Sequence, residues 1–120
     1  MNHSPFPVPE SLRGASIAIV GGENRPRAFH RLRERLGCEI THFETDERDA
    51  SPRRLLRLAS RAFHLIVWIF GRSRHAHGDF VRAVARARKT PCVPMKSVPS
   101  PDRLLAELAR HRASRRGGGA

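Results

Sequence analysis

Short apolar runs alternate along this chain with stretches in which apolar residues recur every three or four positions. The runs are typical of strands buried on both faces of a sheet, and the recurring positions are typical of amphipathic helices. The clearest run covers residues 64–70 (HLIVWIF), in which six of the seven residues are apolar. The pattern predicts four strands, at residues 16–20, 39–44, 64–70 and 91–95.

Four helices are expected between and after these strands. Pro26 fits the first turn of the first helix, and Gly37 is a typical residue just beyond the last turn. The second and fourth helices are expected to begin at the Ser-Pro pairs at 51–52 and 100–101, and the third to run from about residue 78 to 89. The apolar positions expected to face the core from the last three helices are Leu55, Leu58, Ala59, Ala62, Phe80, Val81, Val84, Ala87, Leu104, Leu105, Leu108 and Ala109.

The regular alternation of strands and helices predicts βαβ units and a parallel sheet. Because the crossovers of such units are right-handed, the simplest arrangement is a small three-layer doubly wound α/β fold, flavodoxin-like or Rossmann-like, with about four strands in the order 2-1-3-4. The second and third helices then cover the same face. Pro91 and Pro94 cannot donate hydrogen bonds to a neighbouring strand, which predicts that the fourth strand lies at an edge.

The length of 120 residues is typical of a single domain with its own core. We expect that α/β domain at residues 15–112, with a flexible proline-rich arm at 1–14 and a disordered basic tail at 113–120. The chain has no apolar run long enough to cross a membrane and no apolar signal segment, so a cytoplasmic protein without a membrane partner is expected. Cys38 and Cys92 begin strands on opposite edges, which makes a disulfide between them unexpected.

The chain carries 23 Lys and Arg against 11 Asp and Glu, and its formal net charge is +12. Such a charge favours polyanionic partners, including nucleic acid. An arginine-rich proteome, in which arginine fills exposed helix positions, explains the same count. Few aromatic residues argue against a binder that stacks single-stranded bases. Nucleic-acid binding would use the basic stripes of the second and third helices, namely Arg54, Arg57, Arg61, Arg82 and Arg86.

Polar residues follow the ends of the strands, and the carboxyl ends of parallel strands are where open α/β sheets bind their ligands. Gly21 and Gly22 would let backbone N–H groups approach an anion at the start of a helix. A tight turn also explains two glycines, and the sequence here matches neither of the common phosphate-binding motifs. The residues expected to bind a small anionic or phosphate-bearing ligand are Gly21, Gly22, Arg72, Ser73, His75, Lys96 and Ser97.

Metal binding and acid–base chemistry stay open as alternatives at the same strand ends. His42, Glu44 and His75 are residue types that ligate metals, although their spacing is not diagnostic. His75 beside Glu44 is also a candidate acid–base group, and a surface histidine at the start of a helix explains it as well. The arginine that follows Gly71 stands where a phosphoacceptor receiver needs a carboxylate, which excludes that class. No cofactor is indicated, and the edge strand leaves a homodimer open.

From the first strand to Ser97 the chain resembles a bacterial family known as domain of unknown function twenty-three twenty-five. The resemblance rests on positions between Val20 and Glu44 and on positions between His75 and Ser97. It departs from the family pattern at Phe43, Arg74, Ala85 and Thr90. It implies the α/β fold and the strand-end site, and names no reaction. The matching positions are Val20, Gly21, Gly22, Gly37, Glu39, His42, Glu44, His75, Val81, Arg82, Arg86, Pro91, Lys96 and Ser97.

Overall fold

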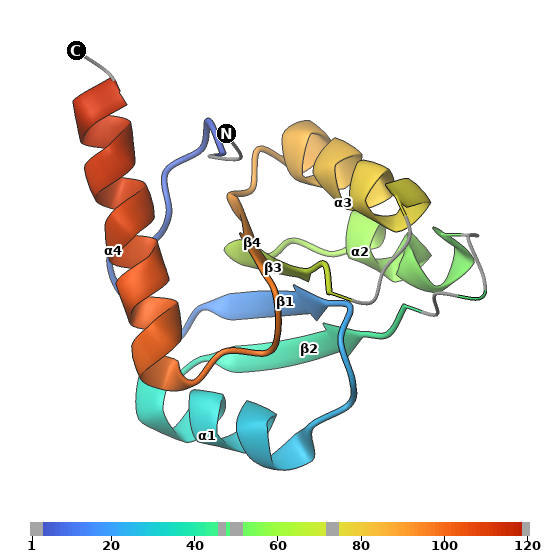
Figure 1. Cartoon of the computed structure of the whole chain (residues 1–120), viewed down its shortest axis with the longest axis horizontal. Coiled ribbons are helices and arrows are strands. Elements are labelled where there is room, and N and C mark those ends of the chain that lie inside the picture. The colour runs from blue at the N-terminus through green and yellow to red at the C-terminus, as the bar shows by residue number, and fades with distance from the viewer. Residues whose placement is uncertain (1–3, 46–47, 49–51, 72–74, 119–120) are drawn as a thin grey trace.

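The computed structural model describes residues 4–45, 48, 52–71 and 75–118, with the backbone alone for residues 52, 75 and 115–118. Four parallel strands form one sheet in the order β2-β1-β3-β4, which confirms the predicted topology (Figure 1). β2 and β4 are the two edge strands, as expected for the proline-containing β4. The strands are β1 (Ser16–Val20), β2 (Glu39–Phe43), β3 (Leu65–Ile69) and β4 (Cys92–Met95).

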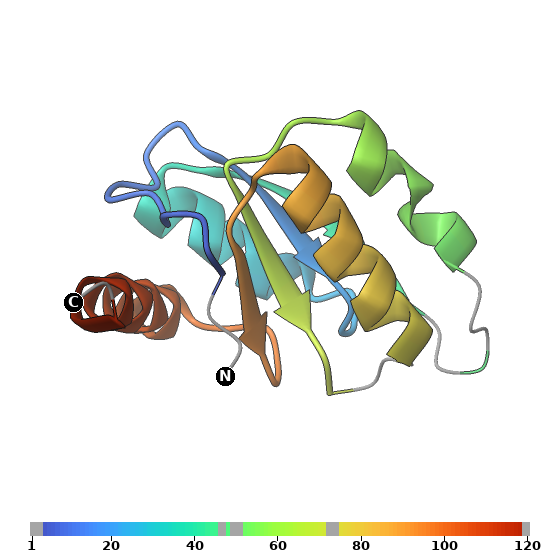
Figure 2. The same ribbon diagram turned by 90° about the horizontal axis from the view of Figure 1, so that it is seen from above.

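The helices cover both faces of this sheet. Figure 2 shows α1 and α4 on one side, and α2 and α3 together on the other side. The prediction that the second and third helices share a face is therefore confirmed. The helical elements are α1 (Pro26–Leu36), the 3-10 turn η1 (Pro52–Leu55), α2 (Leu56–Ser60), α3 (His75–Arg88) and α4 (Pro101–Gly118).

The sheet separates two apolar clusters because successive strand residues point to opposite faces. Under α1 and α4, Ile17 and Val67 pack with residues such as Leu32 and Leu104. Under α2 and α3, Trp68 belongs to the cluster that α3 completes with Val81 and Val84. All five residues of β3 are buried, so the strongest apolar run of the sequence is the centre of the core.

The predicted ends of α1 are confirmed. Pro26 lies in the first turn, where its missing N–H costs no helical hydrogen bond. Gly37 has a φ of 65°, and its N–H donates to the carbonyl oxygen of Arg33 at 2.8 Å. A glycine adopts this left-handed conformation without the steric cost that a side chain would bring.

Several details of the later helices differ from the predicted pattern. The second helix is a 3-10 turn followed by a short α2 that ends at Ser60, so Ala59 and Ala62 are exposed. The tighter 3-10 turn changes which side chains face the sheet. α3 begins at His75, three residues before the predicted start.

Two helices also present different apolar positions from those expected. In α3 the buried stripe is Val81, Val84 and Ala85, whereas Ala87 is exposed. Leu105 of α4 is 44% exposed and Ala109 is exposed, since Leu104 and Leu108 already occupy the contact with the sheet. The predicted stripe of α4 was thus two residues too wide, and that of α3 included Ala87 in place of Ala85.

The segment before β1 is packed against the domain, so the expectation of a flexible arm is wrong for its described residues. Val8 and Leu12 are 6% and 4% exposed and belong to the cluster under α4. The guanidinium of Arg112 donates to the carbonyl oxygen of Pro9 at 2.9 Å. The expected tail also differs, because α4 continues through residue 118 instead of ending near 112.

Candidate ligand site at the strand ends

The helices that follow β1 and β3 lie on opposite sides of the sheet. β1 leads into α1 on one face, and the neighbouring β3 leads into α3 on the other face (Figure 2). The carboxyl ends of two such strands are the usual ligand position in open α/β sheets. The strand order therefore places the candidate site between the segment after Val20 and the segment after Ile69.

The turn after β1 requires glycine at two successive positions. Gly21 and Gly22 have φ values of 92° and 72°, a region that other residues rarely adopt. The N–H of Gly21 donates to the carbonyl oxygen of Phe43 at 2.8 Å, which fixes the turn against β2. A Cβ at Gly22 would lie 3.1 Å from Cγ2 of Ile69. The Gly22 backbone is therefore packed closely against the side chain of Ile69 at the end of β3.

The start of α1 follows this turn with a positive environment. Arg25 occupies the N-cap position without a side-chain capping hydrogen bond, and the first turn of α1 contains no acidic residue. The Arg25 guanidinium lies 3.6 Å from the Glu23 carboxylate, and both side chains are more than half exposed. Unshared N–H groups and the helix dipole favour an anion at such a position. Arg25 was not singled out from the sequence, although its place before Pro26 is a signal for it.

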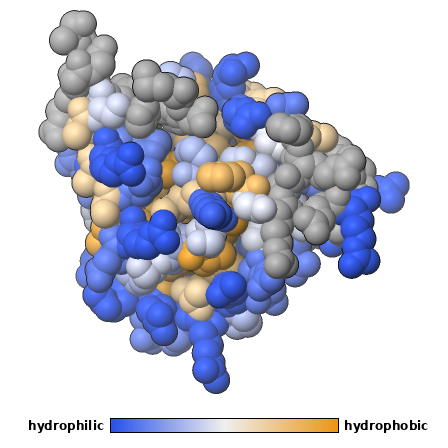
Figure 3. Space-filling view, viewed as in Figure 1, coloured by the Kyte–Doolittle hydropathy of each residue, from blue (hydrophilic) through white to orange (hydrophobic). Residues whose placement is uncertain are grey.

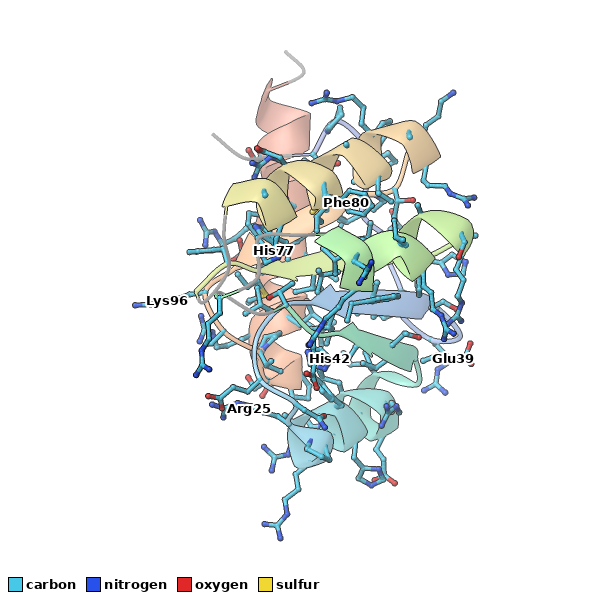
Figure 4. The ribbon with its side chains drawn as sticks, turned by 90° about the vertical axis from the view of Figure 1, so that its right-hand side faces the viewer. Arg25, Glu39, His42, His77, Phe80 and Lys96 are labelled. Carbon is cyan, nitrogen blue, oxygen red and sulfur yellow. The ribbon has the colours of Figure 1, made fainter. Side chains whose placement is uncertain are left out.

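The segments that follow β3 and β4 are in close contact. A Cβ at Gly71 would lie only 2.6 Å from the carbonyl oxygen of Lys96. Lys96 and Ser97 are exposed at the end of β4. Figure 4 shows Lys96 and Arg25 on the side where the strands end, and Glu39 on the opposite side. The glycine thus allows the Lys96 segment to lie against the end of β3.

The predicted anion-binding residues are only partly brought together. Gly21 and Gly22 lie at the end of β1, and Lys96 and Ser97 at the end of β4, with β3 between them. The segment after β4 nevertheless crosses the end of β3 toward the turn, because a Cβ at Gly22 would lie 3.5 Å from Cγ2 of Val98. His75 is the first residue of α3. Arg72 and Ser73 lie outside the described residues.

His42 supports the turn from the side of β2. Its Nε2 donates to the carbonyl oxygen of Gly21 at 2.9 Å, and its ring lies against Phe29 with a centroid distance of 4.9 Å. Glu44 is exposed just beyond the end of β2. Within the described part of the chain, no group of three or more His, Cys, Asp or Glu side chains lies close enough to hold a metal ion. The described contacts of His42 are thus those of a residue that supports the glycine turn.

The basic stripes predicted on the second and third helices are on the surface. All five side chains are exposed, and two of them have local partners. Arg82 donates to the Asp79 carboxylate at 2.8 Å, and Arg61 lies over the ring of Phe63 at 5.1 Å. The five are Arg54, Arg57, Arg61, Arg82 and Arg86.

A scan against models of known protein families found no match to this chain, and searches of curated proteins and of solved structures found none. The family resemblance noted in the sequence stays a prediction. Among the described helices, none combines the length and the apolar character needed to cross a membrane. Both cysteines are free, as expected from their places in the fold.

Proposed function

We propose that this chain is a cytoplasmic, non-enzymatic binding or regulatory module that holds a small anionic or phosphate-bearing ligand at its strand ends. The observation that carries the proposal is the strand order, in which the neighbouring strands β1 and β3 are followed by helices on opposite faces of the sheet. Ligands bind at the carboxyl ends of such strands in open α/β sheets.

The available donors indicate the kind of ligand. The N–H of Gly21 is already bonded to Phe43, so the N–H of Gly22 and the start of α1 would face one anionic group. Lys96, exposed in the segment that follows β4, would offer a second positive charge. A free phosphate ion has no second group to pair with it. We therefore expect a phosphate ester that carries a further polar or anionic group.

A thermal-shift screen tests this function directly. Inorganic phosphate, pyrophosphate, nucleoside monophosphates and sugar phosphates are added in turn, and the melting temperature is measured. We expect one of the phosphate esters to raise the melting temperature more than inorganic phosphate does, because binding to the folded state stabilises it. If none of these compounds raises the melting temperature, the strand-end site is not a phosphate site.

Substitutions then show where the compound that raises the melting temperature binds. We expect the combination of His75→Ala and Lys96→Ala to abolish the ligand-induced shift. Lys89→Ala is the matched control, because Lys89 is the only other lysine of the chain and lies before β4. A shift that survives the double substitution would contradict the proposed position of the ligand.

A second candidate function is nucleic-acid binding by the basic face of α2 and α3. The observation that favours it is that both helices cover the same face of the sheet and carry exposed arginines. Arg88 of α3 also donates through Nε to the carbonyl oxygen of Ala59 in α2 at 3.0 Å, which holds the two helices together. The exposed arginines of the two helices therefore lie on the same side of the sheet, spread from Thr41 of the edge strand β2, which Arg61 contacts, across to α3.

The salt dependence of binding tests this second function. Affinity for duplex DNA is measured at several salt concentrations, because each neutralised phosphate releases condensed counterions. We expect a steep fall of affinity with salt and a large loss when Arg54, Arg57 and Arg82 are replaced by glutamate. The matched control replaces three exposed arginines of α1, on the other face. If both triple variants lose affinity equally, net charge explains the binding and the α2–α3 face does not. The control residues are Arg27, Arg31 and Arg35.

A further inference from the structure

A groove lies along β4 on the face that α3 covers only in part. Val93 and Met95 point into the cluster under α4, whereas Cys92 and Pro94 point to the opposite face and are only half-buried. No helix of the described chain follows β4 onto that face, since α4 packs on the other side (Figure 2). The outer part of β4 is therefore left open beside α3.

The groove has the size of a small-molecule site. Its volume is about 630 Å³, within the range of about 300–1,000 Å³ that is usual for ligand pockets. Residues near the start of the chain form one wall, and α3 forms the other. Figure 3 shows hydrophobic side chains in the middle of the side of the molecule seen in Figure 1, surrounded by hydrophilic ones. The lining residues are Ser4, Pro5, Phe6, Trp68, Phe70, Arg82, Ala85, Arg86, Cys92 and Pro94.

The lining combines aromatic surface with positive charge. Phe6, Trp68 and Phe70 supply three rings, and Phe70 is 48% exposed, one of the few large apolar side chains of the described chain left in water. Arg82 and Arg86 stand on the α3 wall one helical turn apart. Asp79 already holds Arg82, whereas no hydrogen bond or ion pair within the described residues holds Arg86. None of the described residues that line the groove is acidic.

The Cys92 thiol, which lies on the floor of the groove, is uncharged. Burial raises the pKa of the Cys92 thiol to about 12, although the nearby positive charge of Arg82 acts in the opposite direction. The thiol is therefore protonated at neutral pH and adds no negative charge. An anion that enters the groove would meet a guanidinium and aromatic rings, without a like charge among the described lining residues.

We propose that this groove is a second binding site, distinct from the strand-end site, which takes a small aromatic acid. The ring lies against Phe70 and beside Trp68, which lines the groove although it is only 6% exposed, and the acidic group pairs with Arg86. A flat ring covers the apolar floor that water now covers, which provides the apolar part of the affinity. The charged hydrogen bond to Arg86 selects an acid over a neutral aromatic compound.

Three probe compounds separate these contributions. Naphthoate carries both a ring and a carboxylate, naphthalenemethanol carries the ring alone, and cyclohexanecarboxylate carries the carboxylate alone. Their affinities are measured by isothermal titration calorimetry with the full chain. We expect naphthoate to bind at least about tenfold more tightly than either of the others, because each of them lacks one contribution. Equal affinity for naphthoate and naphthalenemethanol would show that Arg86 takes no part and would overturn the proposal.

Nuclear magnetic resonance gives the position of the bound compound. Trp68 is the only tryptophan of the chain, so the protein has a single indole N–H resonance. We expect naphthoate to shift this resonance and to leave the backbone N–H resonances of Gly21 and Gly22 unchanged. Shifts at the two glycines with an unmoved indole resonance would place the acid at the strand ends and would refute the groove site.

Substitutions complete the test. We expect Arg86→Gln to weaken naphthoate binding about tenfold, and Phe70→Ala to weaken it as well, because both side chains are exposed and can change without disturbing the core. Arg110→Gln on α4 is the matched control, since its exposed guanidinium lies on the other face. Lys96→Ala, which weakens the proposed strand-end site, should leave naphthoate binding unchanged. Unaltered affinity in Arg86→Gln would overturn the proposal.

Discussion

Gly71 determines how closely the segments after β3 and β4 approach each other. Its substitution by alanine would place a Cβ 2.6 Å from the backbone carbonyl oxygen of Lys96, which cannot rotate away as a side chain can. We expect Gly71→Ala to lower the free energy of unfolding by about 2–3 kcal/mol, measured by urea denaturation. Gly14→Ala is the control, because nothing lies within 4 Å of a Cβ there and only backbone strain of about 1 kcal/mol is expected. A Gly71→Ala loss no larger than that of the control would contradict the steric argument.

Cys92 gives the protein a dependence of stability on alkaline pH. Burial raises the pKa of its thiol from 9.0 to about 12, so above pH 9 the unfolded chain loses this proton while the folded chain keeps it. The free energy of unfolding is therefore expected to be unaffected by Cys92 below pH 9 and to fall between pH 9 and about 12. Urea denaturation across this range measures the fall, and the chain has no tyrosine that would titrate in it. Cys92→Ser should reduce the fall, whereas an identical pH dependence in the variant would contradict this origin.

The segment before β1 contributes buried side chains to the core. Leu12 is 4% exposed beneath α4, whereas Leu56 of α2 is 59% exposed. We expect Leu12→Ala to lower the free energy of unfolding by about 2–4 kcal/mol, the usual cost of a cavity in a packed core. Leu56→Ala removes the same atoms from the surface and should change stability by no more than about 0.5 kcal/mol. Similar small values for both variants in urea denaturation would mean that the segment contributes little to folding.

The arrangement of the whole molecule was more predictable than its surface features. Strand order and the shared face of α2 and α3 follow from alternation and the handedness of crossovers, which are properties of the chain as a whole. Val8 and Leu12 escaped prediction because they are isolated apolar residues among prolines and form no periodic pattern. The groove was missed for a related reason, since Phe6 and Cys92 meet only after folding. The glycine turn could be predicted from Gly21 and Gly22, but the approach of Val98 to this turn depends on how the segment after β4 crosses the sheet edge.

The net charge of +12 acts on the molecule as a whole. The Cα radius of gyration is 13.5 Å. At about 0.01 M salt the Debye length is about 30 Å, so the positive charges repel one another across the entire protein, whereas at about 0.1 M it is about 10 Å and the repulsion is largely screened. Since the compact state concentrates this repulsion, we expect the melting temperature to rise between these two sodium chloride concentrations and then to level off.

A variant of lower charge tests the origin of this rise. Replacing Arg54 and Arg57 by glutamate lowers the net charge by two for each substitution, at positions that are exposed and outside the core. The expected rise of the melting temperature with salt is therefore smaller in this variant, and its melting temperature at low salt is higher. A rise of the same size in both proteins would instead indicate that chloride binds at a particular site. In that case we expect substitutions at the strand-end site, where the glycine turn and Lys96 lie, to remove the rise of the melting temperature with salt.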